Sequence, residues 1–401
     1  MLEKSSLLAT VLFTFTAAAS AFAADMPGVT ATEIKIGNIM PYSGPASAYG
    51  AIGKVEAAFF KMVNEIGGIN GRMINFDSLD DGYSPAKAVE DARQLVEQDG
   101  VAFVFNSVGT PSNSAIQKYL NQKQVPQLFI STGADKWGDY QHFPWTMGFQ
   151  PSYRTEAQIY SKYILANKTD AKIGILYQSD DFGKDYLAGV KSVLGDKFDK
   201  MVITASYETT DPTIDSQITS LQAAGANVLL VAAISKFAAQ AIRKVHDLDW
   251  KPLFFMSNNS VSIGAVIKPA GPENASDMIT AAYLKDPTDP TWKNDAGMNE
   301  WRDFMAKYMP GADTTDLIYV FAYTVSKAML QVLKQCEGNF SRENIMKQAA
   351  NLHDLELPTL LPGIKVNTNP TNYHPLRQMQ LAKFDGTTWV RFGDVITGAG
   401  N

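Results

Sequence analysis

Short apolar runs rich in β-branched residues alternate with amphipathic segments over most of the chain. The first series of runs predicts strands at 33–40, 73–79, 101–107 and 125–131. A second series begins after about residue 151 and predicts strands at 172–178, 201–207, 227–233 and 252–257. Strands that alternate with helices form mostly parallel sheets with helices on both faces. Two series therefore predict an α/β protein with two doubly wound lobes of similar size.

The last third of the chain has a different pattern. Apolar residues at helical spacing predict long helices over 299–309 and 314–335. Alternating residues on both sides of Asp385-Gly386 predict a β-hairpin over 378–394, because Asp-Gly is a favoured two-residue turn. This region therefore does not continue the alternation of strand and helix.

Residues 1–24 have the pattern of a secretory signal peptide. Lys4 precedes an apolar run from Leu7 to Phe15, and small residues end in Ala-Phe-Ala at 21–23. The apolar run is shorter than the ~20 residues of a membrane span. A buried N-terminal helix is the alternative, which the lack of amphipathic spacing disfavours. No Cys follows the cleavage pattern, so we expect a periplasmic protein without a lipid anchor.

Composition narrows the classes of partner. The formal net charge is −6, the sequence pI is about 5.4 and the basic residues form no cluster, which disfavours nucleic acid as a partner. Cys336 is the only cysteine, so an internal disulfide cannot form. A hydrophobic content of 45% is enough to build a core without one.

The sequence lacks the usual signatures of catalysis and of cofactor binding. The four histidines are scattered, and there is no P-loop, no G-x-S-x-G elbow and no G-x-G-x-x-G turn between strand and helix. The glycine-rich stretch 67–72 is typical of a helix stop and turn. Asp80-Asp81 and Asp180-Asp181 are typical of solvated strand ends and helix starts, with a catalytic pair or calcium site as the alternative. We therefore predict neither an enzyme nor a bound cofactor or metal.

Polar loops at the carboxyl ends of strands are the remaining candidates for function, since ligands of open α/β sheets bind at that edge. In the loop 106–114, Thr110 stands before Pro111, which favours the first helical position and makes Thr110 the predicted N-cap. The free N–H groups of the first turn and the helix dipole would suit a small anion such as a carboxylate. The alternative is ordinary capping with water on the free donors.

The next strand end repeats this arrangement. A small Ser-Thr-Gly-Ala turn at 131–134 would let the backbone approach a ligand, with Trp137 and Tyr140 close by. The alternative is a surface turn covered by aromatic residues.

The order of several segments resembles a known family. The chain is similar to the periplasmic leucine/isoleucine/valine-type solute-binding proteins of ABC importers in five segments: PYSGPASAYG (41–50), GGINGR (67–72), DDGYSPAKAVEDARQLV (80–96), SVGTPSNSA (107–115) and ISTGA (130–134). The resemblance implies a type I periplasmic binding protein, whose two lobes are joined by a three-strand hinge and close over the ligand. Lobe 1 would comprise 30–151 and 282–361, and lobe 2 would comprise 152–281 and 362–401.

The resemblance also implies partners and contacts. We expect a monomer that delivers a small molecule to an ABC permease of the inner membrane. Carried over motif by motif, the ligand contacts in lobe 1 are the aromatic wall Tyr49, the carboxylate-binding Thr110, and the small turn formed by Gly133, Ala134 and Asp135. In lobe 2 the resemblance places an aromatic contact at Phe182.

Departures from the family pattern affect the expected ligand. Amino-acid binders hold the ligand ammonium with acidic residues, whose places are taken here by Asn259 and by about Tyr153. A lobe 2 Tyr of the family corresponds to Ile234 or Ser235. Because a buried ammonium without a carboxylate is costly, we expect a ligand with a carboxylate and no obligatory amino group. Asp135 is an alternative partner for an ammonium.

The stretch 131–153 also resembles the branch of the family that imports aromatic acids. We therefore expect a benzoate- or cinnamate-like acid flanked by Tyr49, Phe182 and Tyr153, with Arg154 either solvated or on the carboxylate. The alternatives are a branched-chain amino acid binder and a small amide or urea binder, which Asn258 and Asn259 would suit. A periplasmic hydrolase lacks a recognisable nucleophile and base, and a receptor sensory module lacks a second membrane segment.

Overall fold

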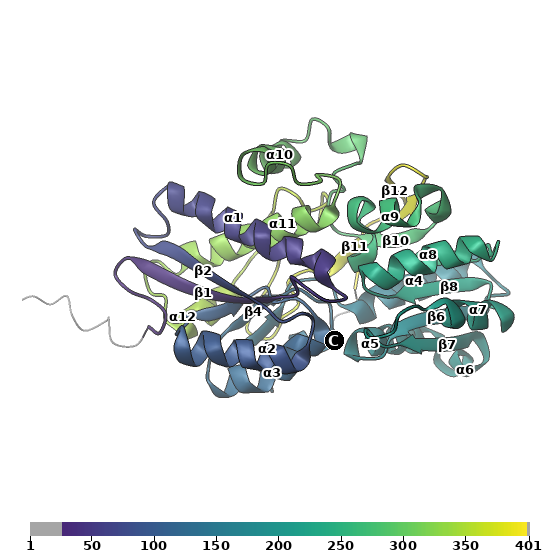
Figure 1. Cartoon of the computed structure of the whole chain (residues 1–401), viewed down its shortest axis with the longest axis horizontal. Coiled ribbons are helices and arrows are strands. Elements are labelled where there is room, and N and C mark those ends of the chain that lie inside the picture. Colours follow the sequence, from purple (N-terminus) through teal and green to yellow (C-terminus); the bar gives the residue numbers. More distant parts are fainter. Residues whose placement is uncertain (1–25, 399–401) are drawn as a thin grey trace, which may run out of the picture.

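The computed structural model describes residues 26–398 and consists of two lobes that lie side by side, each built around a sheet (Figure 1). The predicted signal peptide lies outside these residues. Lobe 1 contains a five-stranded parallel sheet with the spatial order β2 (Met73–Asp80), β1 (Glu33–Met40), β3 (Phe103–Phe105), β4 (Gln127–Ile130) and β5 (Thr146–Gly148). The three strands β3, β4 and β5 are buried throughout, which explains their continuous apolar runs.

Lobe 2 contains an eight-stranded mixed sheet. Its spatial order is β12 (Trp389–Arg391), β11 (Gln378–Phe384), β10 (Ile279–Ala282), β9 (Leu253–Met256), β8 (Val228–Ala232), β6 (Ile173–Gln178) and β7 (Val202–Tyr207), and β13 (Ile396–Thr397) pairs with β11. The strands from β7 to β10 run parallel, and β11 and β12 are antiparallel. The C-terminal hairpin therefore completes the edge of this sheet.

Helices cover both sheets. Lobe 1 carries the 3-10 helices η1 (Ser47–Gly50) and η3 (Asp135–Gly138), and the α-helices α1 (Ala51–Glu65), α2 (Pro85–Arg93), α3 (Thr110–Gln122), α10 (Ala296–Tyr308), α11 (Leu317–Gln335) and α12 (Arg342–Ala349). Lobe 2 carries α4 (Tyr153–Asn167), α5 (Asp181–Leu194), α6 (Phe198–Met201), α7 (Asp215–Ala223), α8 (Ser235–Asp247) and α9 (Lys268–Ala270), with the 3-10 turn η5 (Asn258–Ser260) after β9. Most amphipathic segments thus pack their apolar sides on the sheets, whereas Phe304 of α10 packs on Phe59 of α1 and Tyr323 of α11.

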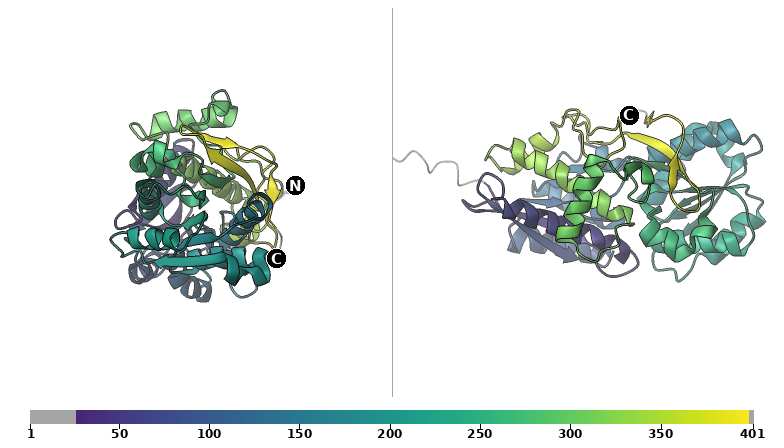
Figure 2. Two further views of the ribbon diagram at one scale, coloured as in Figure 1. Left: turned by 90° about the vertical axis from the view of Figure 1, so that its right-hand side faces the viewer. Right: turned by 90° about the horizontal axis from the view of Figure 1, so that it is seen from above.

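The chain crosses between the lobes three times, after β5, after β10 and before β11. In the view from above, the C-terminal strands in yellow lie near the middle of the molecule, where the lobes meet (Figure 2). The predicted α/β architecture is therefore confirmed, while the residue boundaries assigned to the lobes stay a prediction. All eight predicted strands form, as do both long helices and the hairpin, whose Phe384 pairs with Trp389 across the Asp385-Gly386 turn.

Cys336 lies at the end of α11 and is 2% exposed. Its thiol donates to the Val332 carbonyl over 3.3 Å, and burial raises the pKa of the thiol to about 12. Over residues 26–398, no helix is long and apolar enough to cross a bilayer, and no cluster of His, Cys, Asp and Glu has the arrangement of a metal site.

Candidate ligand-binding site

A cavity with a volume of about 930 Å³, which includes its opening to solvent, lies where the two lobes meet. Its walls come from strand ends and helix starts of both sheets and from the crossing segment after β10. The lining is rich in aromatic and aliphatic side chains, as in many small-molecule sites. The polar side chains on it are Thr110, Ser131, Thr132, Gln150, Asn258, Asn259, Ser262, Thr280 and Asp286.

The start of α3 forms one wall of the cavity. Gly109 has a φ of 102° and precedes the first helical residue, so the prediction of Thr110 as the N-cap is wrong by one position. A side chain at Gly109 would meet the Tyr83 ring at 2.6 Å, which explains why glycine occupies this turn. Thr110 lines the cavity and its hydroxyl shares a 2.7 Å hydrogen bond with that of Thr132.

Two N–H groups at the start of α3 are free. Among the described residues, neither the Thr110 N–H nor the Ser112 N–H donates a hydrogen bond, and Pro111 has no N–H. This is the normal state of a helix N-terminus without a side-chain cap. The positive end of the helix dipole therefore lies at a wall of the cavity, where it can stabilise a bound anion.

Tyr49 joins the two lobes at the cavity wall. It lies in η1 of lobe 1, and its hydroxyl donates to the Asn259 carbonyl and contacts the Ser260 hydroxyl, both at 3.0 Å. The same hydroxyl accepts a hydrogen bond from the Ser235 N–H over 3.1 Å, and burial raises the pKa of Tyr49. A neutral phenol therefore fixes the cavity wall across the lobe boundary.

An aromatic cluster from lobe 2 forms another wall. Tyr153 at the start of α4 and Phe182 at the start of α5 both line the cavity, with ring centroids 4.6 Å apart. Tyr186 stacks on Tyr153 at 5.5 Å from behind. This arrangement offers ring faces and edges to an apolar ligand.

A buried carboxyl group supports the polar turn after β9. Glu156 accepts hydrogen bonds from the Tyr160 hydroxyl and from both the backbone and the side-chain N–H groups of Asn258. Burial raises the pKa of Glu156 to about 7. Asn258 and Asn259 line the cavity, so Glu156 positions this wall without lining it.

The structure places the remaining predicted contacts outside the cavity lining. Gly133 packs against the Pro151 carbonyl, which a side chain would meet at 2.4 Å, and Ala134 is buried behind it. Ser235 reaches the site only through its N–H bond to Tyr49. Five of the predicted residues do line the cavity: Tyr49, Thr110, Tyr153, Phe182 and Asn259.

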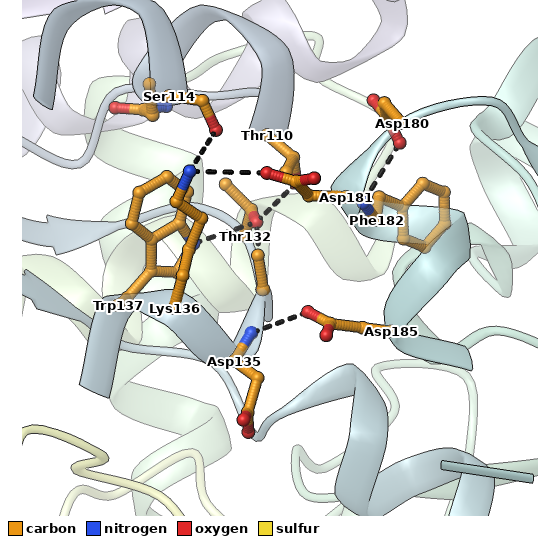
Figure 3. A network of polar contacts seen from close by, with 12 residues as sticks. Thr110, Ser114, Thr132, Asp135, Lys136, Trp137, Asp180, Asp181, Phe182 and Asp185 are labelled. Atoms are coloured by element: carbon orange, nitrogen blue, oxygen red, sulfur yellow. Dashed lines mark hydrogen bonds and ion pairs between the residues drawn. The ribbon is translucent and has the colours of Figure 1, made fainter. Parts of the chain in front are cut away.

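Asp135 belongs instead to a charged rim cluster, which we define as Asp135, Lys136, Arg154, Asp181 and Asp185. Arg154 contacts the carboxylates of Asp135 and Asp185 at 3.1 Å each. The Asp135 N–H donates to Asp185 over 2.7 Å, and Lys136 reaches Asp181 at 3.2 Å (Figure 3). The rim cluster therefore links lobe 1 to α4 and α5 of lobe 2.

Sequence reasoning missed Asp286, which lies on the cavity lining. The lining therefore includes a carboxylate that the family comparison did not place there. The sequence signal was weak because Asp286 follows a strand that was not predicted. Trp389 is a further lining residue that no motif indicated, and Tyr83 and Thr132 lie in segments of the family resemblance without having been named as contacts.

Comparison with known proteins explains this architecture. A family model described as periplasmic binding protein matches residues 33–388. The chain belongs to the periplasmic binding protein family. Members of this family and the matching solved structures are solute-binding proteins rather than enzymes.

The family members most useful for comparison include two curated relatives. A "Leu/Ile/Val-binding protein homolog 3" of Brucella melitensis is 26% identical over 243 residues, which is 58% of this chain and 64% of that protein. A "Leu/Ile/Val-binding protein homolog 7" of Brucella abortus is 23% identical over 372 residues and covers 89% of both chains.

Solved structures of the family share the fold. A branched chain amino acid ABC transporter protein from Thermus thermophilus with bound valine aligns with a TM-score of 0.81 and 14% identity, covering 92% of this chain and 97% of that one. A fatty acid ABC transporter substrate-binding protein from Thermomonospora curvata aligns with a TM-score of 0.75 and 19% identity, covering 93% and 95%.

Proposed function

We propose that this protein is the periplasmic substrate-binding component of an ABC importer and that it captures a small carboxylic acid with an aromatic body. The main support for this proposal is the cavity between the lobes, which combines the free N–H groups at the start of α3 with aromatic walls. Capture would occur by closure of the lobes about the crossing segments, and delivery would be to an inner-membrane permease.

Support for an acid comes from the start of α3. The Thr110 N–H and the hydroxyl pair of Thr110 and Thr132 lie at the wall, where the helix dipole favours negative charge. The relatives named above for valine and for fatty acid also take carboxylic acids. These neighbours share the fold alone, so they indicate the class of ligand rather than its identity.

Support for an aromatic body comes from the other walls. Tyr49, Tyr83, Tyr153, Phe182 and Trp389 contribute aromatic rings to the cavity lining. Offset and edge-to-face contacts with such rings favour a flat aromatic ligand. The second candidate is a branched-chain amino acid, which the carboxylate of Asp286 and the names of the curated relatives favour.

The deciding experiment is a thermal-shift screen of the purified protein without residues 1–24. Benzoates, cinnamates, branched-chain amino acids and small amides are tested at equal concentrations. A ligand at 100 times its Kd adds about 2.7 kcal/mol of stability, which gives a clear rise in Tm. We expect the largest rise with an aromatic acid. A rise with leucine or valine alone would select the second candidate, and a rise with amides alone would reject an acid.

Thr110 provides a direct test of the anion wall. Thr110→Ala removes a hydroxyl and leaves the backbone N–H, so we expect a loss of roughly 1 kcal/mol in binding. Isothermal titration calorimetry with the best ligand of the screen measures this loss. Thr110→Ser is the matched control because it keeps the hydroxyl. Equal affinity of Thr110→Ala and the native protein would remove this hydroxyl from the proposed contacts.

A further inference from the structure

The side chain of Asp286 has one engaged oxygen and one free oxygen. Its Oδ1 accepts hydrogen bonds from the Thr288 N–H over 2.8 Å and from the Thr288 hydroxyl over 2.5 Å. Its Oδ2 is buried and has no hydrogen-bond partner among the described residues. Asp286 as a whole is only 7% exposed, and it lines the cavity.

The turn that Asp286 makes does not need the second oxygen. Asp313 accepts the same two hydrogen bonds from the N–H and hydroxyl of Thr315, in an exposed loop. Asn369 does so toward Thr371 with an amide in place of a carboxylate. An asparagine would therefore suffice for the structure at position 286.

The free oxygen also lacks a charge partner. None of the described residues that line the cavity is Lys, Arg or His. The Thr288 hydroxyl is occupied by Oδ1 and by the Thr388 hydroxyl at 3.0 Å. A buried acceptor without a partner destabilises the protein, and more so if it is charged. A hydrogen bond from a bound ligand to Asp286 Oδ2 would offset this destabilisation.

We propose that Asp286 is a ligand contact whose Oδ2 accepts a hydrogen bond from an N–H or O–H group of the bound molecule. The inference rests on the proposed function of the cavity and narrows its ligand class. The ligand would be an acid that also carries a donor, either a hydroxyl or a protonated amine. The start of α3 would hold the carboxylate, and Asp286 would select the donor.

The protonation state of the side chain is consistent with this role. Burial raises the pKa of Asp286 to about 6, so the group remains mostly ionised at pH 7.5 and can only accept hydrogen bonds. A site built to hydrogen-bond a ligand donor discriminates strongly against analogues that lack it, because the buried acceptor is then left unpaired.

The test uses matched acids that differ in the donor. Calorimetry at pH 7.5 compares benzoate with 3- and 4-hydroxybenzoate, and 4-methylpentanoate with leucine. In the native protein we expect one donor-bearing acid to bind at least tenfold more tightly than its partner. The pair that shows the difference identifies the donor as a hydroxyl or as an amine.

Asp286→Asn is the decisive variant, because it keeps the acceptor for Thr288 and presents an NH₂ donor in place of Oδ2. We expect it to abolish the tenfold preference and to leave the acid without the donor unaffected. Asp313→Asn makes the same substitution in a similar turn outside the cavity, where it also removes an ion pair with Lys268 at 3.2 Å, and it should retain the preference.

Three outcomes would contradict the inference. Equal binding of both members of each pair to the native protein would overturn it while leaving the acid-binding function intact, and the site would then hold water at Oδ2. A preference that persists in Asp286→Asn would assign the donor to another residue. Failure of every acid to bind would overturn the proposed function as well.

Discussion

Two of the regions through which the lobes meet differ in character. At the cavity wall, the contact is the neutral Tyr49 hydroxyl, buried among Ser235, Asn259 and Ser260. At the rim cluster, the contacts are charged, and the side chains of Lys136 and Asp181 remain 33% and 48% exposed. The buried region has fixed geometry and little access to water. At the rim, the Lys136–Asp181 pair is open to solvent and counterions, whereas the side chains of Asp135 and Asp185 around Arg154 are only 13% and 12% exposed.

This difference separates two tasks. A neutral buried contact is worth most when its geometry is satisfied, and its loss leaves unpaired groups. Exposed ion pairs contribute little individually and weaken with salt. We therefore expect the contacts at the cavity wall to determine ligand affinity. The rim cluster should change that affinity only modestly. The predictions below test that division, from the largest expected effect to the smallest.

The largest effect should come from Glu156, which supports the cavity wall. Its pKa is raised from 4.5 to about 7 by burial, so the native state binds more protons than the unfolded state between these values. Stability therefore falls as pH rises through this window, by about 3 kcal/mol for this group. Glu156→Gln should remove this part of the decline in Tm between pH 4.5 and 7.

Glu300→Gln is the matched control for the pH experiment. Glu300 also accepts from a tyrosine, Tyr323, but hydrogen bonds and the Lys327 charge leave its pKa below the usual value. The Glu300→Gln variant should therefore show the same decline in Tm between pH 4.5 and 7 as the native protein. Parallel Tm profiles for native protein and Glu156→Gln would show that Glu156 titrates normally.

The next effect is that of Tyr49→Phe at the lobe boundary. The change keeps the ring and removes the hydroxyl, which leaves the Ser235 N–H without its acceptor. We expect binding to weaken by roughly 2 kcal/mol, or roughly 30-fold, at any salt concentration. Calorimetry at low and high NaCl measures the loss of affinity and shows whether that loss depends on salt. The control variant Tyr140→Phe removes a phenol hydroxyl that does not line the cavity, so it should bind the ligand normally. Unaltered affinity in Tyr49→Phe would show that the Tyr49 hydroxyl does not contribute to binding.

The smallest effect should come from the rim cluster. Arg154→Ala leaves the carboxylates of Asp135 and Asp185 without their shared cation, at a cost of about 1–2 kcal/mol in low salt, because these side chains are only 13% and 12% exposed. Lys136→Met should cost about 0.5 kcal/mol or less, because its partner Asp181 is exposed. Both losses should shrink in 0.5 M NaCl. A loss of affinity that does not depend on salt, or one larger than that of Tyr49→Phe, would show that the rim cluster rather than the cavity wall determines affinity.

Much of the fold follows from local sequence pattern. The strand 33–40 coincides with β1, and the hairpin follows from Asp385-Gly386. The strands β5 and β10 escaped prediction because they contain few large apolar residues, unlike the equally short β3 and β4. Thr110 was misplaced by one position because the positive φ of Gly109 supplies the helix entry in place of a side-chain cap.

The site was predictable only where motifs carried it. Tyr49, Thr110 and Phe182 each follow a strand of a β–loop–helix unit, so their positions follow from local structure. Asp286 lies on a crossing segment, and only tertiary packing brings it to the cavity. Asp135 and Arg154 lie next to predicted contact residues in the sequence. In the structure Arg154 instead forms ion pairs with Asp135 and Asp185 at the rim. Pairing of this kind cannot be recognised without coordinates.

The state of Cys336 has a practical consequence for following this protein in solution. The thiol is enclosed by α11 and protonated at neutral pH, so alkylating dyes have no reactive thiolate to attack among the described residues. A cysteine introduced at an exposed position near Lys136 would accept a fluorophore as a single label. Because the rim spans both lobes, the emission of that dye would test the proposed closure and, if the signal changes with ligand, turn the native scaffold into a reagentless optical sensor.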